Sequence, residues 1–420
     1  MRYGLIGSPL GHSHSPFLHE RMGGEGYALL ELPESALAGF FAAKEFDGVN
    51  VTIPYKRAVI PLLDEVDDTA RECGAVNTVI NRGGRLVGYN TDLYGMRFAL
   101  DAAGISLAGK RVVVLGSGGT SHTARALAAR EGAASVRVVS RSGEYGYSDL
   151  SPLANAEILL NTTPVGMFPH MDAEPLSLSA FPALEGFFDA VYNPLRTRLA
   201  LAADERGIKR ADGLLMLAAQ AKASRELFTG REIPERSDRQ AAAVITDAYR
   251  ALFLSLTNIV LIGMPGSGKT TVGGELAALL GRDLVDTDEF VERNAGRSIP
   301  DIFAVSGETA FRDLEQKAVF NAGSMQGKVI ATGGGAVLRL ENRLSLAANG
   351  FVVYLRRDTD CLAREGRPLS LSGDLAAMLA ARDPVYSAFA DLITVNSGDP
   401  KTVATKIAEA FHEDPRHKRS

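Results

Sequence analysis

Short runs of apolar and β-branched residues alternate with longer Ala- and Leu-rich stretches along the whole chain. The apolar runs predict strands at Tyr3–Ile6, Val49–Ile53, Arg111–Leu115, Ser135–Ser140, Ile158–Asn161, Asn258–Ile262, Val329–Thr332 and Phe351–Leu355. Amphipathic stretches such as His122–Arg130 and Thr271–Leu280 predict helices between them. Strands that alternate with helices are typical of α/β proteins whose sheets are mostly parallel.

Two Gly-rich turns, at residues 116–121 and 263–270, each join a predicted strand to a predicted helix. Each turn is expected to open its own doubly wound unit. The stretch Ala241–Leu256 predicts a helix that runs almost directly into the strand Asn258–Ile262, and so short a joint constrains how the two units are placed. The polar residues His412–Ser420 predict a frayed tail.

Composition narrows the class of protein. A chain of 420 residues suits two or three domains, and 46% hydrophobic with 23% charged residues is normal for a soluble globular protein. The net charge of -5 disfavours nucleic acid or an anionic membrane as a partner. The two distant cysteines, Cys73 and Cys361, fit a reducing cytosol and are expected to be buried thiols. No run reaches the ~18 apolar residues of a membrane helix. We therefore expect a cytoplasmic protein, whose oligomeric state the sequence does not determine.

The second Gly-rich turn has the Walker A sequence GMPGSGKT between a predicted strand and a predicted helix. Backbone N–H groups in such a turn and at the helix N-terminus bind phosphates. Lys269 is positioned to reach the β- and γ-phosphates, and the Thr270 hydroxyl to ligate Mg²⁺. The sequence thus predicts an ATP and magnesium site formed by Gly263, Gly266, Ser267, Gly268, Lys269, Thr270 and Thr271.

Five further motifs follow the Walker A turn. Asp286 and Asp288 come just after a predicted strand, where they either share a cleft or serve as a helix N-cap with a first-turn acid. Downstream lie GETAFRDLE, TGGGAV, RPL and RDPVY, which begin at residues 307, 332, 367 and 382. Together and in this order, these motifs resemble shikimate kinase from about Asn258 to Phe411.

The resemblance to shikimate kinase implies a role for each motif. Asp288 would bind the shikimate hydroxyls and accept the proton of the attacking hydroxyl, and Asp286 would help to hold Mg²⁺. Arg367 would contact the ATP phosphates, with Arg364 near the nucleotide. The remaining substrate contacts would come from the carboxylate-binding Arg312 and Arg382 and from the backbone of Gly333, Gly334 and Gly335.

The first Gly-rich turn, GSGGTS, supports a dinucleotide site. The next predicted strand ends in Ser140–Arg141, and an Arg at this point favours the 2′-phosphate of NADP, whereas NAD sites favour an acid. The histidines His12, His14 and His19 are a weak metal signal, because the His12-x-His14 pattern has no acid or cysteine close to it.

Seven motifs in the first 253 residues together resemble shikimate dehydrogenase. They are HSHSP, NVTIPYK, AVNTV, GYNTD, LGSGGTS, NTTPVGM and GLLMLAAQA. The resemblance implies a substrate domain at residues 1–95, to which 216–253 return, and a Rossmann-like NADP-binding domain at 96–215. A P-loop kinase domain with a parallel sheet would follow at 256–420.

The resemblance to shikimate dehydrogenase also implies site residues. Lys56 and Asp92 would form the catalytic pair, since reduction of a ketone leaves an alkoxide that needs a proton. Substrate contacts would come from Ser13 and Ser15 to the carboxylate and from Thr52, Asn77, Asp92 and Gln220 to the hydroxyls. The cofactor contacts would be Gly116, Ser117, Gly118, Gly119, Thr120, Ser121, Ser140, Arg141, Thr162, Val191 and Gly213.

We therefore expect a bifunctional enzyme that reduces 3-dehydroshikimate with NADPH and then phosphorylates shikimate with MgATP. One alternative is a ligand sensor or repressor built on the same folds, which the retained Lys56, Asp92 and Lys269 disfavour. Another is a dehydrogenase that acts on quinate with NAD, which the paired serines and Arg141 disfavour.

Overall fold

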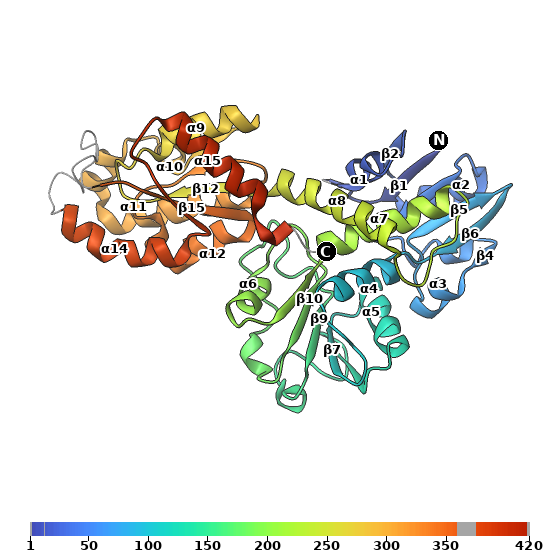
Figure 1. Cartoon of the computed structure of the whole chain (residues 1–420). Coiled ribbons are helices and arrows are strands. Elements are labelled where there is room, and N and C mark those ends of the chain that lie inside the picture. The colour runs from blue at the N-terminus through green and yellow to red at the C-terminus, as the bar shows by residue number, and fades with distance from the viewer. Residues whose placement is uncertain (1, 12, 359–374, 418–420) are drawn as a thin grey trace.

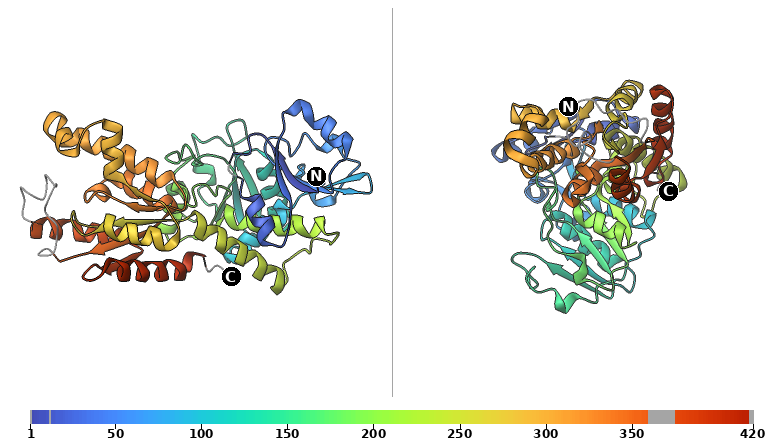
Figure 2. Two further views of the ribbon diagram at one scale, coloured as in Figure 1. Left: turned by 90° about the horizontal axis from the view of Figure 1, so that it is seen from above. Right: turned by 90° about the vertical axis from the view of Figure 1, so that its left-hand side faces the viewer.

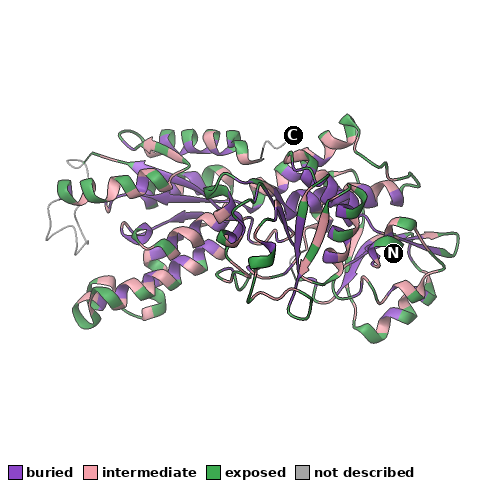
Figure 3. Cartoon of the chain, turned by 90° about the horizontal axis from the view of Figure 1, so that it is seen from below, coloured by how far each residue is buried: buried purple, intermediate pink, exposed green. Residues whose placement is uncertain are grey.

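The computed structural model describes residues 2–11, 13–358 and 375–417. Three sheets follow one another along the chain, and helices flank them (Figures 1 and 2). The central strands of each sheet are buried (Figure 3). Four residues discussed above, His12, Cys361, Arg364 and Arg367, lie outside the described residues; Cys73 is buried, as predicted.

The first sheet is mixed and not parallel throughout. Its strands, in spatial order, are β2 (Tyr27–Glu31), β1 (Tyr3–Gly7), β3 (Gly48–Val51), β5 (Thr78–Arg82), β6 (Arg85–Tyr89) and β4 (Glu65–Val66). The pairs β3–β5 and β5–β6 are antiparallel. The two-residue turn Gly83–Gly84 has positive φ at both positions, the geometry that joins adjacent antiparallel strands. This hairpin makes β5 and β6 antiparallel, whereas the pairs β1–β2, β1–β3 and β4–β6 are parallel.

Helices cover this first sheet and connect it to the rest of the chain. They are α1 (Ser15–Arg21), α2 (Leu37–Ala43), α3 (Asp68–Cys73), α4 (Asp92–Ala102), α7 (Gly213–Phe228) and α8 (Arg239–Leu256). Although α7 comes after the second sheet in sequence, it packs along α4 and against β5, so the chain returns to its first unit. The predicted helix before the kinase region is α8, and Thr257 alone separates it from the third sheet.

The second and third sheets are parallel, as expected. The second has the strand order β11 (Lys209–Asp212), β10 (Gly186–Asp189), β9 (Ile158–Asn161), β7 (Arg111–Leu115) and β8 (Ser135–Val139), with helices α5 (Gly119–Arg130) and α6 (Arg198–Glu205). The third has the order β13 (Leu284–Asp286), β14 (Val329–Ala331), β12 (Asn258–Ile262), β15 (Gly350–Arg356) and β16 (Leu392–Val395).

The third sheet carries the helices α9 (Lys269–Leu280), α10 (Thr287–Ala295), α11 (Ile299–Ser324), α12 (Leu340–Asn349), α14 (Leu375–Phe389) and α15 (Pro400–Glu413). We expected the tail from His412 to be frayed, and this expectation is wrong up to residue 417. Helix α15 continues to Glu413, and Arg416 then donates to Asp414 and to the backbone oxygen of Gly350. Among the described residues, no helix is long and apolar enough to cross a bilayer.

Candidate functional site

A lysine and a carboxylate meet at the edge of the first sheet. Lys56 lies in the turns that follow β3, and Asp92 is the first residue of α4. The Lys56 Nζ and Asp92 Oδ2 are 2.5 Å apart, and the two side chains are only 18% and 8% exposed. Asn77 Nδ2 donates to the other oxygen, Asp92 Oδ1, at 2.9 Å. Both carboxylate oxygens of Asp92 are therefore hydrogen-bonded, and the carboxylate holds the Lys56 ammonium in a largely buried position.

Other predicted substrate residues gather near this pair. Ser15 opens α1, and its hydroxyl accepts from Ser13 at 3.2 Å, so two hydroxyls lie side by side. Gln220, which returns on α7, accepts a hydrogen bond from Thr91 at 3.4 Å, and Thr91 also lies 2.9 Å from Asn77 Nδ2. Residues more than one hundred positions apart thus share one network with the catalytic candidates.

The structure adds four residues that we did not predict as site residues. Asn50 Nδ2 donates to Thr78 at 2.9 Å and to Ser224 at 2.8 Å, and all three side chains are buried. Thr91 joins them, since its hydroxyl lies 3.1 Å from that of Ser224. A buried polar network of this kind orients its members when every group is paired. Its sequence signal is an Asn or Thr inside an otherwise apolar strand.

The predicted dinucleotide residues all lie at the carboxyl edge of the second sheet. Five strands end there, and five groups follow them: Gly116 after β7, Ser140 and Arg141 after β8, Thr162 after β9, Val191 after β10 and Gly213 after β11. In open α/β sheets this edge is where ligands bind. Gly116 has φ +103°, which a side chain would disfavour, so the glycine permits the tight turn into α5.

Two hydroxyls of this group brace the turn and do not face outward. Ser121 donates to Gly116 O at 2.7 Å, and Thr162 donates to Leu115 O at 2.5 Å. Ser117 and Arg141 remain exposed and Ser140 is buried. The turn also approaches the Lys56–Asp92 pair, because a Cβ built on Gly119 would lie 3.8 Å from Lys56 Cδ. A dinucleotide on this turn would bind beside the lysine.

The Walker A turn joins β12 to α9, as predicted. Lys269 opens the helix, and its Nζ donates to the backbone oxygens of Gly263 at 3.0 Å and Met264 at 2.9 Å. The Ser267 Oγ is buried and has no hydrogen-bond partner among the described groups. A buried donor without a partner costs free energy, so an oxygen-rich ligand in the turn would stabilise it.

Of the two interpretations of the acids of β13 and α10, the helix N-cap is confirmed, and the shared cleft stays a prediction. Asp286 caps α10, since its Oδ1 accepts from Asp288 N at 2.9 Å, and its Oδ2 accepts from the Thr270 hydroxyl at 2.8 Å. An exposed hydroxyl beside a carboxylate fits Mg²⁺, which takes few protein ligands and completes its shell with phosphate oxygens and water. Asp288 is more buried than Thr270. Burial, and then the charge of Asp286, raises the pKa of Asp288 to about 6.

The predicted acceptor site is assembled around Asp288. A Cβ on Gly333 would lie 2.6 Å from Asp288 Oδ1, so only glycine lets the backbone come this close to the acid. Arg382 lies 3.4 Å from the backbone oxygen of Gly334, and the Tyr386 hydroxyl donates to the same oxygen. Asp288 Oδ1 is buried without a hydrogen-bond partner among the described groups, which leaves an acceptor for a substrate hydroxyl.

Glu315 belongs to this site, although we assigned it no role from sequence. Its side chain is 1% exposed, and its Oε2 accepts from Arg312 at 2.8 Å. Burial raises the pKa of Glu315 even though the guanidinium of Arg312 lowers it. Arg312 also contacts Glu308 at 3.2 Å, and Glu308 is exposed. The buried carboxylate therefore orients the arginine from below. The sequence signal for this pair was the spacing of three residues between Arg312 and Glu315, which brings two side chains together on a helix.

The fold and these two sites define a two-part enzyme: an oxidoreductase with a dinucleotide site, followed by a P-loop phosphotransferase. Comparison with known families agrees. The model described as "Shikimate dehydrogenase substrate binding domain" matches residues 5–79, and the model described as "Shikimate kinase" matches residues 265–412. The chain belongs to the shikimate dehydrogenase family, and it carries a shikimate kinase domain at its C-terminal end.

Individual relatives match the dehydrogenase part. The NADP(+) shikimate dehydrogenase of Symbiobacterium thermophilum is 37% identical over 272 residues, covering 57% of this chain and 92% of the relative. A chorismate mutase/shikimate 5-dehydrogenase fusion protein from Clostridium acetobutylicum is 33% identical, covering 60% of this chain and 96% of that structure, with a TM-score of 0.55. The Thermus thermophilus enzyme, solved with NADP(H) and shikimate, is 34% identical with a TM-score of 0.53, covering 60% and 99%.

These findings make the chain a bifunctional shikimate-pathway enzyme. Its two parts are an NADP-dependent dehydrogenase and a kinase that uses ATP and Mg²⁺.

Proposed function

We propose that the N-terminal part reduces 3-dehydroshikimate to shikimate with NADPH, and that the C-terminal part phosphorylates shikimate at its 3-hydroxyl with MgATP. The observation that carries the proposal is the position of Lys56, which contacts Asp92 at 2.5 Å and lies beside Gly119 of the dinucleotide turn. Hydride transfer and proton transfer must occur at one carbonyl, and the closeness of Lys56 to the dinucleotide turn supports such a shared reaction centre.

In the dehydrogenase, NADPH supplies the hydride. Lys56 donates a proton to the oxygen of the carbonyl as it becomes an alkoxide, and Asp92 holds the ammonium and accepts from the neighbouring substrate hydroxyl. The adjacent Ser13 and Ser15 hydroxyls bind the substrate carboxylate, with Asn77 and Gln220 on the ring hydroxyls. Thr52, which follows β3 directly, completes this set.

In the kinase, transfer depends on position and charge and needs little covalent chemistry. Asp288 accepts the proton of the attacking hydroxyl. Arg312, supported by Glu315, and Arg382 bind the substrate carboxylate. Lys269 neutralises the transferred phosphoryl group. Thr270 and Asp286 would hold Mg²⁺, which offsets charge on the phosphate oxygens.

The proposed domain division follows the three sheets: 1–95 with 216–253, then 96–215, then 256–420. The expectation of a cytoplasmic enzyme whose partners are small molecules, with no nucleic acid or membrane, stays a prediction.

A coupled assay tests the function. The purified protein receives 3-dehydroshikimate with NADPH or NADH, and then ATP, and the products are identified by mass spectrometry. Lys56→Ala should abolish NADPH oxidation and leave shikimate phosphorylation intact, whereas Lys269→Ala should do the reverse. Loss of both activities in either variant, or faster turnover of quinate with NAD than of shikimate with NADP, would contradict the proposal.

A further inference from the structure

The loop that joins β10 to α6, residues 190–197, is anchored at both ends on one buried acid. Asp189 accepts from the backbone N–H of Val191 at 3.1 Å and from the Thr197 hydroxyl at 2.5 Å. Asn161 adds a third hydrogen bond at 3.0 Å. Thr197 also caps α6. The base of the loop is therefore fixed, and Val191, the residue expected beside the nicotinamide, sits in that base.

The tip of the same loop contacts the kinase part of the chain. The Leu195 N–H donates to Asn349 Oδ1 at 2.9 Å, and the Arg196 N–H donates to Ala348 O at 2.9 Å. The Arg196 guanidinium donates to the backbone oxygens of Ala347 and Gly350, the latter at 3.0 Å. The half-buried position of Arg196 lowers its pKa to about 10. Four hydrogen bonds thus join two adjacent loop residues to the end of α12.

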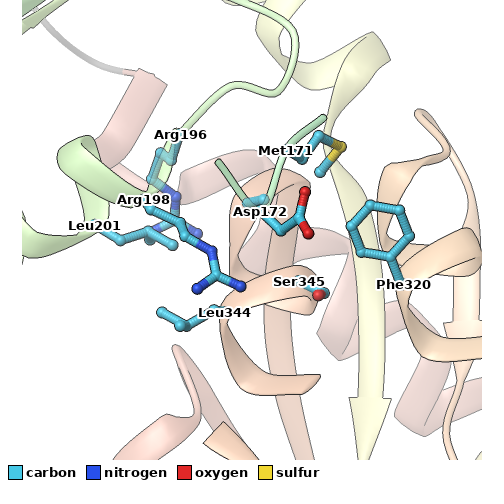
Figure 4. Close-up of a pocket in the computed structure, with 9 residues that line it drawn as sticks. Met171, Asp172, Arg196, Arg198, Leu201, Phe320, Leu344 and Ser345 are labelled. Atoms are coloured by element: carbon cyan, nitrogen blue, oxygen red, sulfur yellow. The ribbon is translucent and has the colours of Figure 1, made fainter. Parts of the chain in front are cut away.

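Side chains around this contact add to it. Arg198 pairs with Glu341 of α12, and Gln326 donates to Asn193 at 3.2 Å. Figure 4 shows Arg196 and Arg198 on one side, facing Leu344 and Ser345 on the kinase side. The space left between them is about 10 Å³, too small for a ligand and of the size that holds one water, so the two parts are closely packed.

On the kinase side, the contact falls where three elements meet. Asn349 ends α12 and is 1% exposed, and its Nδ2 donates to Gly323 O of α11 at 3.1 Å. Helix α11 carries the acceptor-site residue Arg312. Gly350 opens β15, which pairs with β12, the strand that leads into the Walker A turn. The corner is therefore part of the kinase core and is built to stay in place.

A second connection joins the kinase to the other half of the dehydrogenase. Helix α8 packs against α7 and runs through Thr257 into β12, and Arg250 of α8 donates to His412 O at 3.0 Å. The kinase is thus attached to the first-sheet unit through α8 and to the second-sheet unit through the 190–197 loop. Those two units provide Lys56 and the dinucleotide turn, respectively.

We propose that the α11–α12–β15 corner of the kinase is the docking surface for the 190–197 loop, and that Arg196 and Asn349 are positioning residues for the dehydrogenase. By holding the tip of the loop, the kinase sets the position of its nicotinamide-side base relative to the first-sheet unit. The dehydrogenase then depends on a folded kinase. The activity consequence rests on the proposed function, but the contact itself does not.

Arg196→Met in the full chain tests the proposal, because Met keeps most of the apolar stem and removes the charge and both guanidinium hydrogen bonds. We expect the KM for NADPH to rise about five- to tenfold, which is the size of one ordinary hydrogen bond, while the kinase kcat/KM for shikimate stays within about twofold. Hydrogen exchange at the amides of Leu195 and Arg196 should accelerate about tenfold.

Arg206→Met is the matched control. Arg206 lies at the other end of α6, and it donates to the backbone oxygens of Leu178 and Phe181 inside the second-sheet unit, away from the kinase. It should leave the NADPH KM and the loop amides unchanged. A second variant, Asn349→Ala, changes only the kinase side and should raise the KM for NADPH as Arg196→Met does.

Unchanged loop amides and NADPH KM in Arg196→Met would overturn the proposal, and so would an equal effect of Arg206→Met. If the wild-type protein oxidised no NADPH, the proposed function would fail, and the hydrogen exchange alone would then decide whether the contact exists.

Discussion

The buried histidine of α1 makes the stability of the first-sheet unit depend on pH. His19 is 2% exposed, and its ring stacks on Tyr27 with centroids 4.1 Å apart and planes at 13°. Its Nε2 has no hydrogen-bond partner among the described groups. Burial, and then the charge of Arg225, lowers the pKa of His19 to about 3, although a hydrogen bond with Asn50 raises it.

The sign of the effect follows from proton binding in the two states. In the unfolded chain the histidine binds a proton as the pH falls below its ordinary value of 6.5, whereas in the folded chain it stays neutral down to about 3. The unfolded state therefore binds more protons between these values, and the stability contributed at neutral pH is lost as the pH falls. Between about pH 7.5 and about pH 5.5 the loss is about 1.4 kcal/mol.

The measurement compares the wild type with His19→Phe, which keeps an aromatic ring in the stack and cannot be protonated. The chain has no tryptophan, so urea unfolding is followed by far-UV circular dichroism and by loss of NADPH oxidation. The wild type should lose about 1.4 kcal/mol more than the variant over this pH range. His170→Phe, at an exposed histidine, should behave as the wild type does. Equal losses in the wild type and in His19→Phe would refute the reasoning.

Three other predictions follow from single contacts. Glu315→Gln removes the buried charge that pairs with Arg312 and should raise the KM for shikimate about 10- to 100-fold. Glu308→Gln, which changes the exposed partner of Arg312, should alter this KM by less than about threefold. Initial rates of the kinase reaction measure both effects. Gly213→Ala puts a Cβ 2.2 Å from Ala190 O and should lower the free energy of unfolding in urea by about 1–3 kcal/mol. Gly274→Ala, where α9 leaves open space for a Cβ, should raise it by about 0.5–1 kcal/mol. The reverse order of stabilities would contradict the geometry. Arg141→Ala should raise the KM for NADPH about tenfold and leave that for NADH unchanged, and a parallel rise in both would remove Arg141 from the 2′-phosphate site.

Local structure could be predicted from sequence because its causes are local. The Walker A turn and the GSGGTS turn lie between a predicted strand and a predicted helix, and both have that context in the structure. The strands predicted from apolar runs are present, with ends that differ by one or two residues. The sheets are mostly parallel, as predicted, and the antiparallel pairs are confined to the first sheet, where the turn Gly83–Gly84 makes one of them a hairpin.

The residues of the candidate site could be named from motifs, but not how they are arranged. No sequence pattern indicated that Gly119 approaches Lys56, since sixty-three positions separate them and only packing of α5 on α3 and its neighbours closes the distance. Nor did it indicate that Ser121 and Thr162 brace the turn with their hydroxyls. A side chain's partner depends on which groups packing brings within about 3 Å, which no local pattern records.

By itself, the sequence determined the class of each part, because glycine conformation, hydrophobic periodicity and the chemistry of Lys269, Asp288 and Arg141 act within a few residues. Tertiary structure alone decided that Glu315 supports Arg312 from the core and that the 190–197 loop docks on the kinase. The partners of Arg196 are backbone oxygens of residues 347 and 350. Every residue has such an oxygen, so the contact leaves no signature in the residue types and exists only once the two sheets are folded side by side.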